Sequence, residues 1–126
     1  MAKRILVVDD SRAMAMKTCM VLKRAGFETA SLTESLDTAA YLQQHPVDLL
    51  ILDVEMPGKT GYQVCDELRS QPEFDNLPVM FLTTREDHLD RLKGYAVGAQ
   101  EYVNKDYDEQ TLIQHVRKLM GVRAES

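Results

Sequence analysis

The chain has 126 residues, which is enough for one domain with a single hydrophobic core and too few for two. Its formal net charge is -5 at pH 7, and its acidic and basic residues are mixed along the sequence, so we expect no direct nucleic-acid partner, which would need a concentrated basic face. No apolar run approaches the roughly 20 residues of a membrane span, and the N-terminal residues lack the apolar stretch of a signal peptide, so the sequence predicts a cytoplasmic protein without a membrane partner.

Five apolar segments predict β-strands. Two stretches, residues 49–52 and 79–82, are continuously apolar, which is typical of strands that helices cover on both faces. The five segments are residues 4–8, 27–32, 48–52, 78–82 and 101–103.

Apolar stripes at helical spacing lie between or after these segments and predict amphipathic helices. Gly26, Gly98 and Gly121 stand where helices should end, as C-terminal caps. Cys19 and Cys65 are far apart and show no zinc-site spacing, so we expect buried free thiols. The stripes consist of Met14, Thr18, Val21, Leu22 and Ala25; of Val64, Cys65 and Leu68; and of Leu112, Val116, Leu119 and Met120.

Strand and helix alternate five times, which predicts an α/β fold: a doubly wound, five-stranded parallel sheet with helices on both faces. We expect the flavodoxin-like (βα)5 arrangement with strand order 2-1-3-4-5. No linker or repeat divides the chain, so residues 1–121 are predicted to form one domain. Residues 122–126 are interpreted as a C-terminal tail or the start of a linker.

Polar side chains follow four of the predicted strands. In a doubly wound sheet, ligands bind at the carboxyl ends of the strands, beside the point where the strand order reverses. With the order 2-1-3-4-5, these side chains converge on one rim. They are Asp9 and Asp10 after the first strand, Asp53 after the third, Thr83 and Thr84 after the fourth, and Lys105 after the fifth.

The three carboxylates of this rim suggest a divalent cation. Gathered together they repel one another, and a hard cation such as Mg²⁺ prefers oxygen ligands. Asp10 and Asp53 suit direct coordination, with Asp9 acting through water. Once the metal and the Lys105 ammonium offset its charge, the Asp53 carboxylate can attack phosphorus and form an acyl phosphate.

Structural roles are an alternative for several of these residues. Asp10 with Ser11 suits an N-cap of the first helix, and Thr84 with Asp87 matches a capping box of the fourth. Asp53 has no obvious helix to cap, which favours a functional role for it.

The motifs ILVVDDS, LLILDVEMPGKTGY, VMFLTT and GAQEYVNK resemble, in order and spacing, the receiver domain of two-component response regulators. The likeness covers nearly the whole chain. It implies that Asp53 accepts a phosphoryl group from the phosphohistidine of a histidine kinase or phosphotransfer protein. It also implies that Asp9, Asp10 and Asp53 hold Mg²⁺ with help from the backbone carbonyl of Glu55.

The resemblance further implies that Thr83 and Lys105 contact the phosphoryl oxygens, and that Tyr102 is an aromatic switch that turns inward when Thr83 moves toward the phosphate. The fourth helix, fifth strand and fifth helix, roughly residues 86–120, would then change the surface shown to a downstream protein or a fused effector domain. A homodimer through this face is a further option. An ordinary aromatic role for Tyr102 stays open.

Side chains near the phosphoacceptor are expected to tune how long the phosphate lasts. The positions are Glu55, Thr84 and Arg85, and we hypothesise that Glu55 and Arg85 form an ion pair over the site. The chain would then catalyse its own phosphotransfer and dephosphorylation without being a conventional enzyme.

Three other classes fit less well. A phosphatase of the haloacid dehalogenase type needs a second Asp where Glu55 stands, and the carboxylates of Asp9 and Asp10 would repel the phosphate of a flavodoxin's cofactor. A dinucleotide site lacks its glycine pattern. A pseudo-receiver that keeps the fold and binds proteins without phosphorylation remains the alternative.

Lys105 is followed by Asp106, whereas most receivers have proline there, joined by a cis peptide bond. Because a cis bond before a non-proline residue costs about 2.5 to 4 kcal/mol, we expect a trans bond. Asp108 is the predicted N-cap of the last helix, and Asp106 with Glu109 is an alternative cap.

Overall fold

The centre of the fold is one parallel sheet of five strands. A computed structural model describes residues 2–84 and 88–121. Its strands are ordered β2-β1-β3-β4-β5, which confirms the predicted sheet and its order. The strands are β1 (Arg4–Val8), β2 (Glu28–Leu32), β3 (Leu49–Leu52), β4 (Val79–Thr83) and β5 (Glu101–Asn104).

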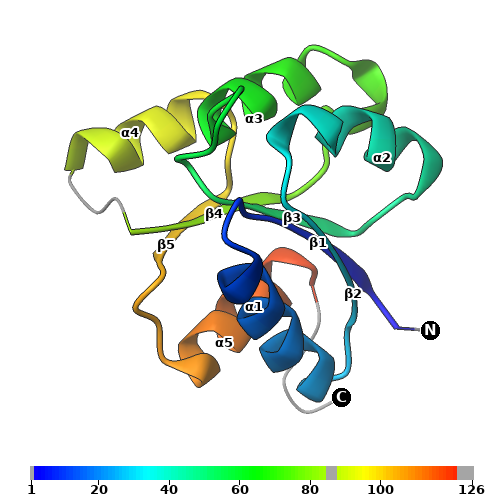
Figure 1. The fold of residues 1–126 in the computed structure, drawn as a ribbon, viewed down its shortest axis with the longest axis vertical. Helices are drawn as coiled ribbons and strands as arrows, with labels where there is room; N and C mark the ends of the chain where they lie inside the picture. Colours follow the sequence, from blue (N-terminus) through cyan, green and yellow to red (C-terminus); the bar gives the residue numbers. More distant parts are fainter. Residues whose placement is uncertain (1, 85–87, 122–126) are drawn as a thin grey trace.

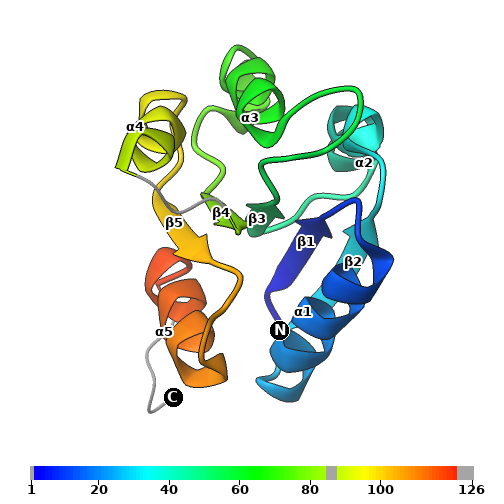
Figure 2. The ribbon, with the colours of Figure 1, turned by 60° about the vertical axis from the view of Figure 1, so that its left-hand side comes forward.

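Helices cover both faces of the sheet. In Figure 1, α1 and α5 lie on one face and α2, α3 and α4 on the other. The turned view in Figure 2 agrees, with α4 and α5 on opposite sides of β5. The helices are α1 (Arg12–Arg24), α2 (Thr38–Gln44), α3 (Gly61–Arg69), α4 (His88–Ala96) and α5 (Glu109–Leu119), with short 3₁₀ turns at Ser35–Asp37 and Pro72–Phe74.

The central strands are buried because each contributes side chains to two separate cores. Leu49 and Ile51 pack in the cluster beneath α1 and α5, whereas Leu50 and Leu52 pack in the cluster beneath α2, α3 and α4. Alternation along one apolar strand therefore feeds both layers, as expected for a strand covered on both faces.

The predicted N-cap at Ser11 and the three predicted C-terminal glycine caps are confirmed. The N-cap of α1 is Ser11, whose hydroxyl accepts a hydrogen bond from the Met14 N–H at 3.3 Å, so Asp10 is not the cap. Gly26, Gly98 and Gly121 all have positive φ values, as C-terminal caps require.

The apolar stripes were predicted with small shifts. Met14 and Ala25 are only partly buried, and Ala15 and Cys19 take part in the buried face of α1. On α5 the buried residues include Ile113, while Leu119 and Met120 pack partly buried against the same core.

Both cysteines are buried free thiols, as predicted. Burial raises the pKa of the Cys65 thiol to about 11 and also raises the pKa of Cys19. Neither thiol therefore has the lowered pKa of a reactive cysteine.

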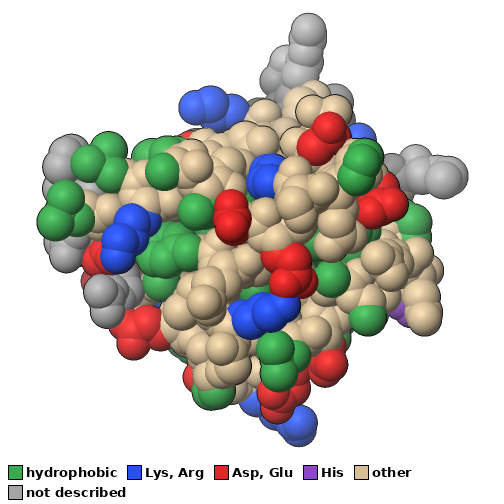
Figure 3. Space-filling model, turned by 90° about the horizontal axis from the view of Figure 1, so that it is seen from above, with side chains coloured by type: hydrophobic (Ala, Val, Ile, Leu, Met, Phe, Trp, Pro, Cys, Tyr) green, Lys and Arg blue, Asp and Glu red, His purple; other side chains and the backbone are tan. Residues whose placement is uncertain are grey.

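The surface carries charges of both signs. On the face formed by α2, α3 and α4, acidic, basic and hydrophobic side chains are interspersed (Figure 3). Among the described residues, no helix combines the length and the apolar character that a membrane crossing needs. Residues 122–126, the predicted tail or linker, lie outside the described residues.

Candidate functional site

The carboxyl ends of β1, β3, β4 and β5 meet at one rim of the sheet. Asp9 comes directly after β1 and Asp53 directly after β3, and these two strands pair side by side, Val8 opposite Leu52. Thr83 ends β4, and Lys105 follows β5. The rim therefore gathers the side chains whose convergence the strand order predicted.

Three carboxylates form a cluster there. One oxygen from each of Asp9, Asp10 and Asp53 lies within 4.8 Å of the others. Asp9 and Asp53 are buried, with only 4% and 6% of their surface exposed, whereas Asp10 is exposed. Within residues 2–84 and 88–121, the Asp10 carboxylate makes no hydrogen bond or ion pair, which leaves its oxygens available to a ligand.

The main chain holds the two buried carboxylates. The Ser11 N–H donates to Asp9 Oδ1 at 2.9 Å, and the Val54 N–H donates to Asp53 Oδ1 at 2.8 Å. The Asp53 N–H in turn donates to the Val8 carbonyl at 2.9 Å, which continues the β1–β3 pairing past the strand end. Each carboxylate thus keeps its second oxygen for another partner.

Lys105 is that partner. Its Nζ lies 2.8 Å from Asp9 Oδ2 and 3.3 Å from Asp53 Oδ2, and its side chain is 11% exposed. The Lys105 N–H donates to the Thr83 carbonyl at 2.8 Å, so the hydrogen bonding between β4 and β5 continues one residue past the end of β5. One ammonium therefore bridges two of the three carboxylates.

Burial and charge shift the pKa values of this group. The pKa of Asp53 is raised, chiefly because burial disfavours the charged carboxylate; Lys105 opposes the rise and Asp9 adds to it. For Lys105, burial lowers the pKa, but the hydrogen bond to Asp9 and the charges of Asp53 and Asp9 outweigh it and raise the pKa overall. Lys105 is thus fixed as a cation, while Asp53 is a more basic carboxylate than usual.

The residues fit a hard divalent cation. The cluster supplies only oxygen ligands, two carboxylates that share one ammonium, and a third, exposed carboxylate with no other bond to a described residue. Mg²⁺ prefers this donor set and commonly keeps several waters, which the exposed side of Asp10 can accommodate.

Gly61 is a residue of the site that sequence reasoning missed. It opens α3, and its N–H donates to the Val54 carbonyl at 2.8 Å. A Cβ at this position would overlap the backbone carbonyl oxygen of Asp53. Glycine therefore lets the first turn of α3 lie directly against the phosphoacceptor candidate. A glycine at the start of a helix, directly after the capping Thr60, was the available signal.

The other predicted site residues are placed in part. Thr83 is buried at the rim, and Thr84 and Glu55 are exposed. Arg85 lies outside the described residues, as does Asp87, so the predicted Glu55–Arg85 ion pair and the Thr84–Asp87 capping box stay predictions.

Tyr102 points into the protein. It is 3% exposed, its ring centroid lies 6.0 Å from that of Phe81, and its hydroxyl lies 3.4 Å from the Tyr62 hydroxyl. The Arg91 guanidinium lies 5.3 Å from the centre of its ring. Gly94 of α4 makes room for this ring, since a Cβ there would lie 2.8 Å from Tyr102 Cδ2.

The loop after Lys105 was predicted correctly in one respect and wrongly in another. Within the described residues no peptide bond is cis, so the bond from Lys105 to Asp106 is trans, as expected. Asp108 is the N-cap of α5, although its side chain makes no capping hydrogen bond. The alternative cap, Asp106 with Glu109 at the third helical position, is wrong because Glu109 is the first residue of the helix.

Sequence comparisons agree with this geometry. A sequence model described as the response regulator receiver domain matches residues 5–117. The phosphate regulon transcriptional regulatory protein PhoB of Rhizobium meliloti is 34% identical over 120 residues, which cover 95% of this chain and 53% of that protein. The chain thus spans about half the length of several curated relatives it matches. Protein PilH of Pseudomonas aeruginosa is 31% identical over 94% of this chain and 98% of that protein.

Solved structures share the same fold. A putative response regulator from Chloroflexus aurantiacus superposes with a TM-score of 0.92 at 29% identity, covering 96% of this chain and 99% of that one. The chemotaxis protein CheY4 of Vibrio cholerae superposes with a TM-score of 0.89 at 28% identity, covering 94% of this chain and 99% of that one.

Proposed function

The chain belongs to the receiver domain family of two-component response regulators, and on that premise we propose that Asp53 accepts a phosphoryl group from a histidine kinase or phosphotransfer protein. The observation that carries the proposal is the shared contact of Lys105 with Asp9 and Asp53, at the point where Asp10 adds a third, exposed carboxylate. A structural ion pair would not need that third carboxylate.

The proposed reaction moves one phosphoryl group. An oxygen of the Asp53 carboxylate attacks the phosphorus of a phosphohistidine, the phosphorus–nitrogen bond breaks, and its electron pair returns to the imidazole of the donor. The product is an acyl phosphate on Asp53. The raised pKa of the Asp53 carboxylate makes it more basic than an ordinary aspartate. The Lys105 ammonium offsets the negative charge of the neighbouring carboxylates.

Members of this family typically bind Mg²⁺ through an acidic cluster. Here Asp10 and Asp53 would hold the ion directly, Asp9 would act through water, and the Glu55 carbonyl would supply a further oxygen. When bound, the ion would neutralise charge on the phosphoryl oxygens.

Two further groups are proposed to contact the phosphoryl oxygens. The Lys105 ammonium would exchange part of its contact with the carboxylates for contact with the phosphoryl oxygens. The Thr83 hydroxyl would donate a hydrogen bond to a phosphoryl oxygen. Glu55, Thr84 and Arg85 would border the phosphate and set its lifetime.

The output face is proposed to be α4, β5 and α5. The exposed side chains of Leu89, Leu92 and Tyr95 give α4 an apolar surface, and a groove of about 400 Å³ runs from α4 across β5 to α5. Because Tyr102 already points inward beneath α4, phosphorylation would hold this ring in place rather than draw it in.

The partner of this face is a separate protein, a fused effector domain or a second copy of the chain. PhoB and PilH, one much longer than this chain and one of nearly equal length, are similar to it over the same region. A pseudo-receiver is less well supported, since the acidic and lysine positions of the rim are all filled.

The test is incubation of the purified protein with acetyl phosphate and Mg²⁺, followed by intact mass measurement. We expect a mass increase of one phosphoryl group that is stable in acid, is lost in base and is absent from Asp53→Asn. If no adduct forms with any small donor, the chain is not a phosphoacceptor. Amide chemical shifts of the same sample should change on α4, β5 and α5, and unchanged shifts there would refute the output face.

A further inference from the structure

The turn that carries Lys105 is held on both sides of that residue. Before it, the Lys105 N–H donates to the Thr83 carbonyl of β4 at 2.8 Å. After it, the Asp106 N–H donates to the side-chain oxygen Oδ1 of Asn104 at 2.7 Å. Asn104 is itself the last residue of β5 and stands opposite Thr83 in the β4–β5 register. One side chain thus links the end of the strand to the backbone just beyond the lysine.

This hydrogen bond is an Asx turn, in which an asparagine side chain takes the place of a backbone carbonyl and accepts from the N–H two residues on. It sets the direction in which the chain leaves β5. A lysine has a long, flexible side chain that can aim in many directions, so the position of its ammonium depends on where its backbone is fixed. The residue after the lysine is Asp106, whose backbone is less restricted than that of a proline would be.

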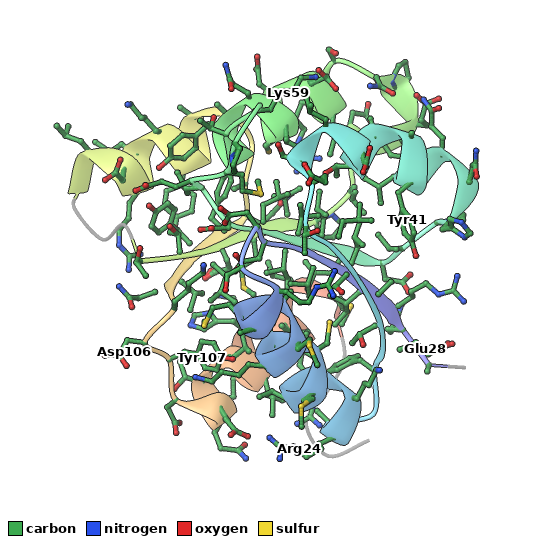
Figure 4. All side chains as sticks on the ribbon, viewed as in Figure 1. Arg24, Glu28, Tyr41, Lys59, Asp106 and Tyr107 are labelled. Carbon is green, nitrogen blue, oxygen red and sulfur yellow. The ribbon has the colours of Figure 1, made fainter. Side chains whose placement is uncertain are left out.

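The loop is also anchored beyond the turn. Figure 4 shows Asp106 on the outer side of the loop and Tyr107 turned toward α1. Tyr107 packs partly buried against the core beneath α1 and α5, and the Lys17 ammonium of α1 lies 5.3 Å from the centre of its ring. The chain therefore passes from the strand end at Asn104 to the packed ring of Tyr107 in three residues, and the Asn104 hydrogen bond lies within that short path.

We propose that Asn104 is a positioning residue for phosphoryl transfer: by accepting the Asp106 N–H, it fixes the turn that aims the Lys105 ammonium at Asp53. This inference rests on the proposed function and adds to it a residue that touches neither the carboxylates nor the phosphoryl group. Asn104 acts entirely through Lys105, and this dependence separates positioning from a general contribution to stability.

The test compares initial rates of Asp53 phosphorylation by acetyl phosphate at saturating Mg²⁺. Asn104→Val removes the acceptor and replaces it with a residue that favours strands, so β5 should still form. Asn104→Asp keeps an acceptor oxygen at the same place. We expect Asn104→Val to slow phosphorylation by about fivefold, the rate equivalent of about 1 kcal/mol, and Asn104→Asp to restore at least half of the wild-type rate.

A matched control lies at the other end of the same strand pair. Gln100 Oε1 accepts the Val79 N–H at 2.8 Å, so Gln100→Ala removes the same kind of hydrogen bond far from the rim. Its phosphorylation rate should equal that of the wild type. A loss as large as that of Asn104→Val would show that losing any side-chain hydrogen bond to the main chain at either end of β5 slows phosphorylation, and it would overturn the proposal.

A double-mutant cycle with Lys105→Ala separates positioning from a purely structural role. It compares the effect of Asn104→Val on the phosphorylation rate in the presence and in the absence of the lysine. If Asn104 acts through Lys105, adding Asn104→Val to Lys105→Ala causes no further loss of rate. An equal fold-loss in both backgrounds would overturn the proposal, as would a wild-type rate in Asn104→Val alone. If the wild-type protein itself forms no adduct, the proposed function fails and this inference fails with it; if the wild type is phosphorylated and Asn104→Val matches its rate, the inference alone fails.

Discussion

Asp9 and Asp53 follow the two central strands that pair with each other, whereas Lys105 follows the edge strand β5. The carboxylates are held by N–H groups one or two residues away, from Ser11 and Val54. Lys105 depends on a loop that a side chain shapes. The two buried carboxylates are therefore held by the sheet itself, whereas Lys105 is held only by the loop after β5. We expect the Lys105 side chain, rather than the carboxylates, to move when a phosphoryl group arrives.

The largest expected effect comes from a substitution next to Asp53. Gly61→Ala should destabilise the protein by about 3 kcal/mol, because the new Cβ would overlap the Asp53 carbonyl oxygen and the backbone cannot move aside without disturbing β3 or α3. The measurement is urea unfolding followed by circular dichroism.

Gly26→Ala is the control for that substitution. Gly26 has a φ of 100°, but a Cβ added there would meet no atom within 4 Å, so only backbone strain opposes alanine. That strain is expected to cost about 1 kcal/mol. Equal losses for the two variants would mean that the close packing of α3 on Asp53 is unimportant.

The second largest effect is expected from the removal of Lys105. Lys105→Ala leaves two buried carboxylates facing each other without their shared cation, so we expect a loss of about 2 kcal/mol in unfolding free energy without Mg²⁺. Mg²⁺ should restore more stability to this variant than to the wild type, because the ion replaces the missing charge. The measurement is urea unfolding with and without the ion.

Lys59→Ala is the matched control, since Lys59 pairs with Glu67 on the surface. An exposed pair contributes less than about 1 kcal/mol, and its loss should not depend on Mg²⁺. If Lys105→Ala responds to the ion no more than Lys59→Ala, the lysine does not serve the acidic cluster.

The smallest expected effect concerns pH. Because the pKa of Asp53 is raised by folding, chiefly by burial, the folded state binds its proton more tightly than the unfolded state does. The resulting stability is fully present below the usual carboxyl pKa of 3.8 and is lost as the pH rises through the folded pKa. At pH 7 the ionised Asp53 therefore weakens the fold.

Asp53→Asn should accordingly raise the unfolding free energy at pH 7, by less than the losses expected for Gly61→Ala and Lys105→Ala. The gain should shrink as the pH falls toward 3.8. Asp66→Asn, an exposed carboxyl on α3, is the control and should change little. A gain for Asp53→Asn that stays constant with pH would show that the buried charge is not its cause.

The same contrast explains which parts could be predicted from sequence. Asp9, Asp10 and Asp53 could be placed because they follow apolar strands whose ends and order the pattern gives. Lys105 could be placed at the rim for the same reason. The distances from its ammonium to two carboxylates depend on the conformation of the loop after β5. Hydrophobic periodicity predicts helices and strands but not the conformation of a loop, so these contacts could not be predicted in detail.

The misses are local contacts. The hydrogen bond from the Asp106 N–H to the Asn104 side chain, 2.7 Å long, belongs to a turn that no hydrophobic pattern predicts. An asparagine two residues before the missing proline was the available signal. The wrong alternative cap at Asp106 is also a local error: the Asp106 N–H takes part in this turn, and α5 begins only at Glu109, after the cap Asp108. The inward direction of Tyr102 depends on the space left by Gly94, eight residues earlier on α4.

The most direct test of the central claim is to locate the phosphoryl group on a single residue. The protein is treated with acetyl phosphate and Mg²⁺ and then with borohydride, which reduces an acyl phosphate to the alcohol, and the peptides are sequenced by mass spectrometry. We predict homoserine at position 53, after β3, and unchanged aspartate at positions 9 and 10. A phosphorylated protein whose modification lies at any other residue would contradict the account.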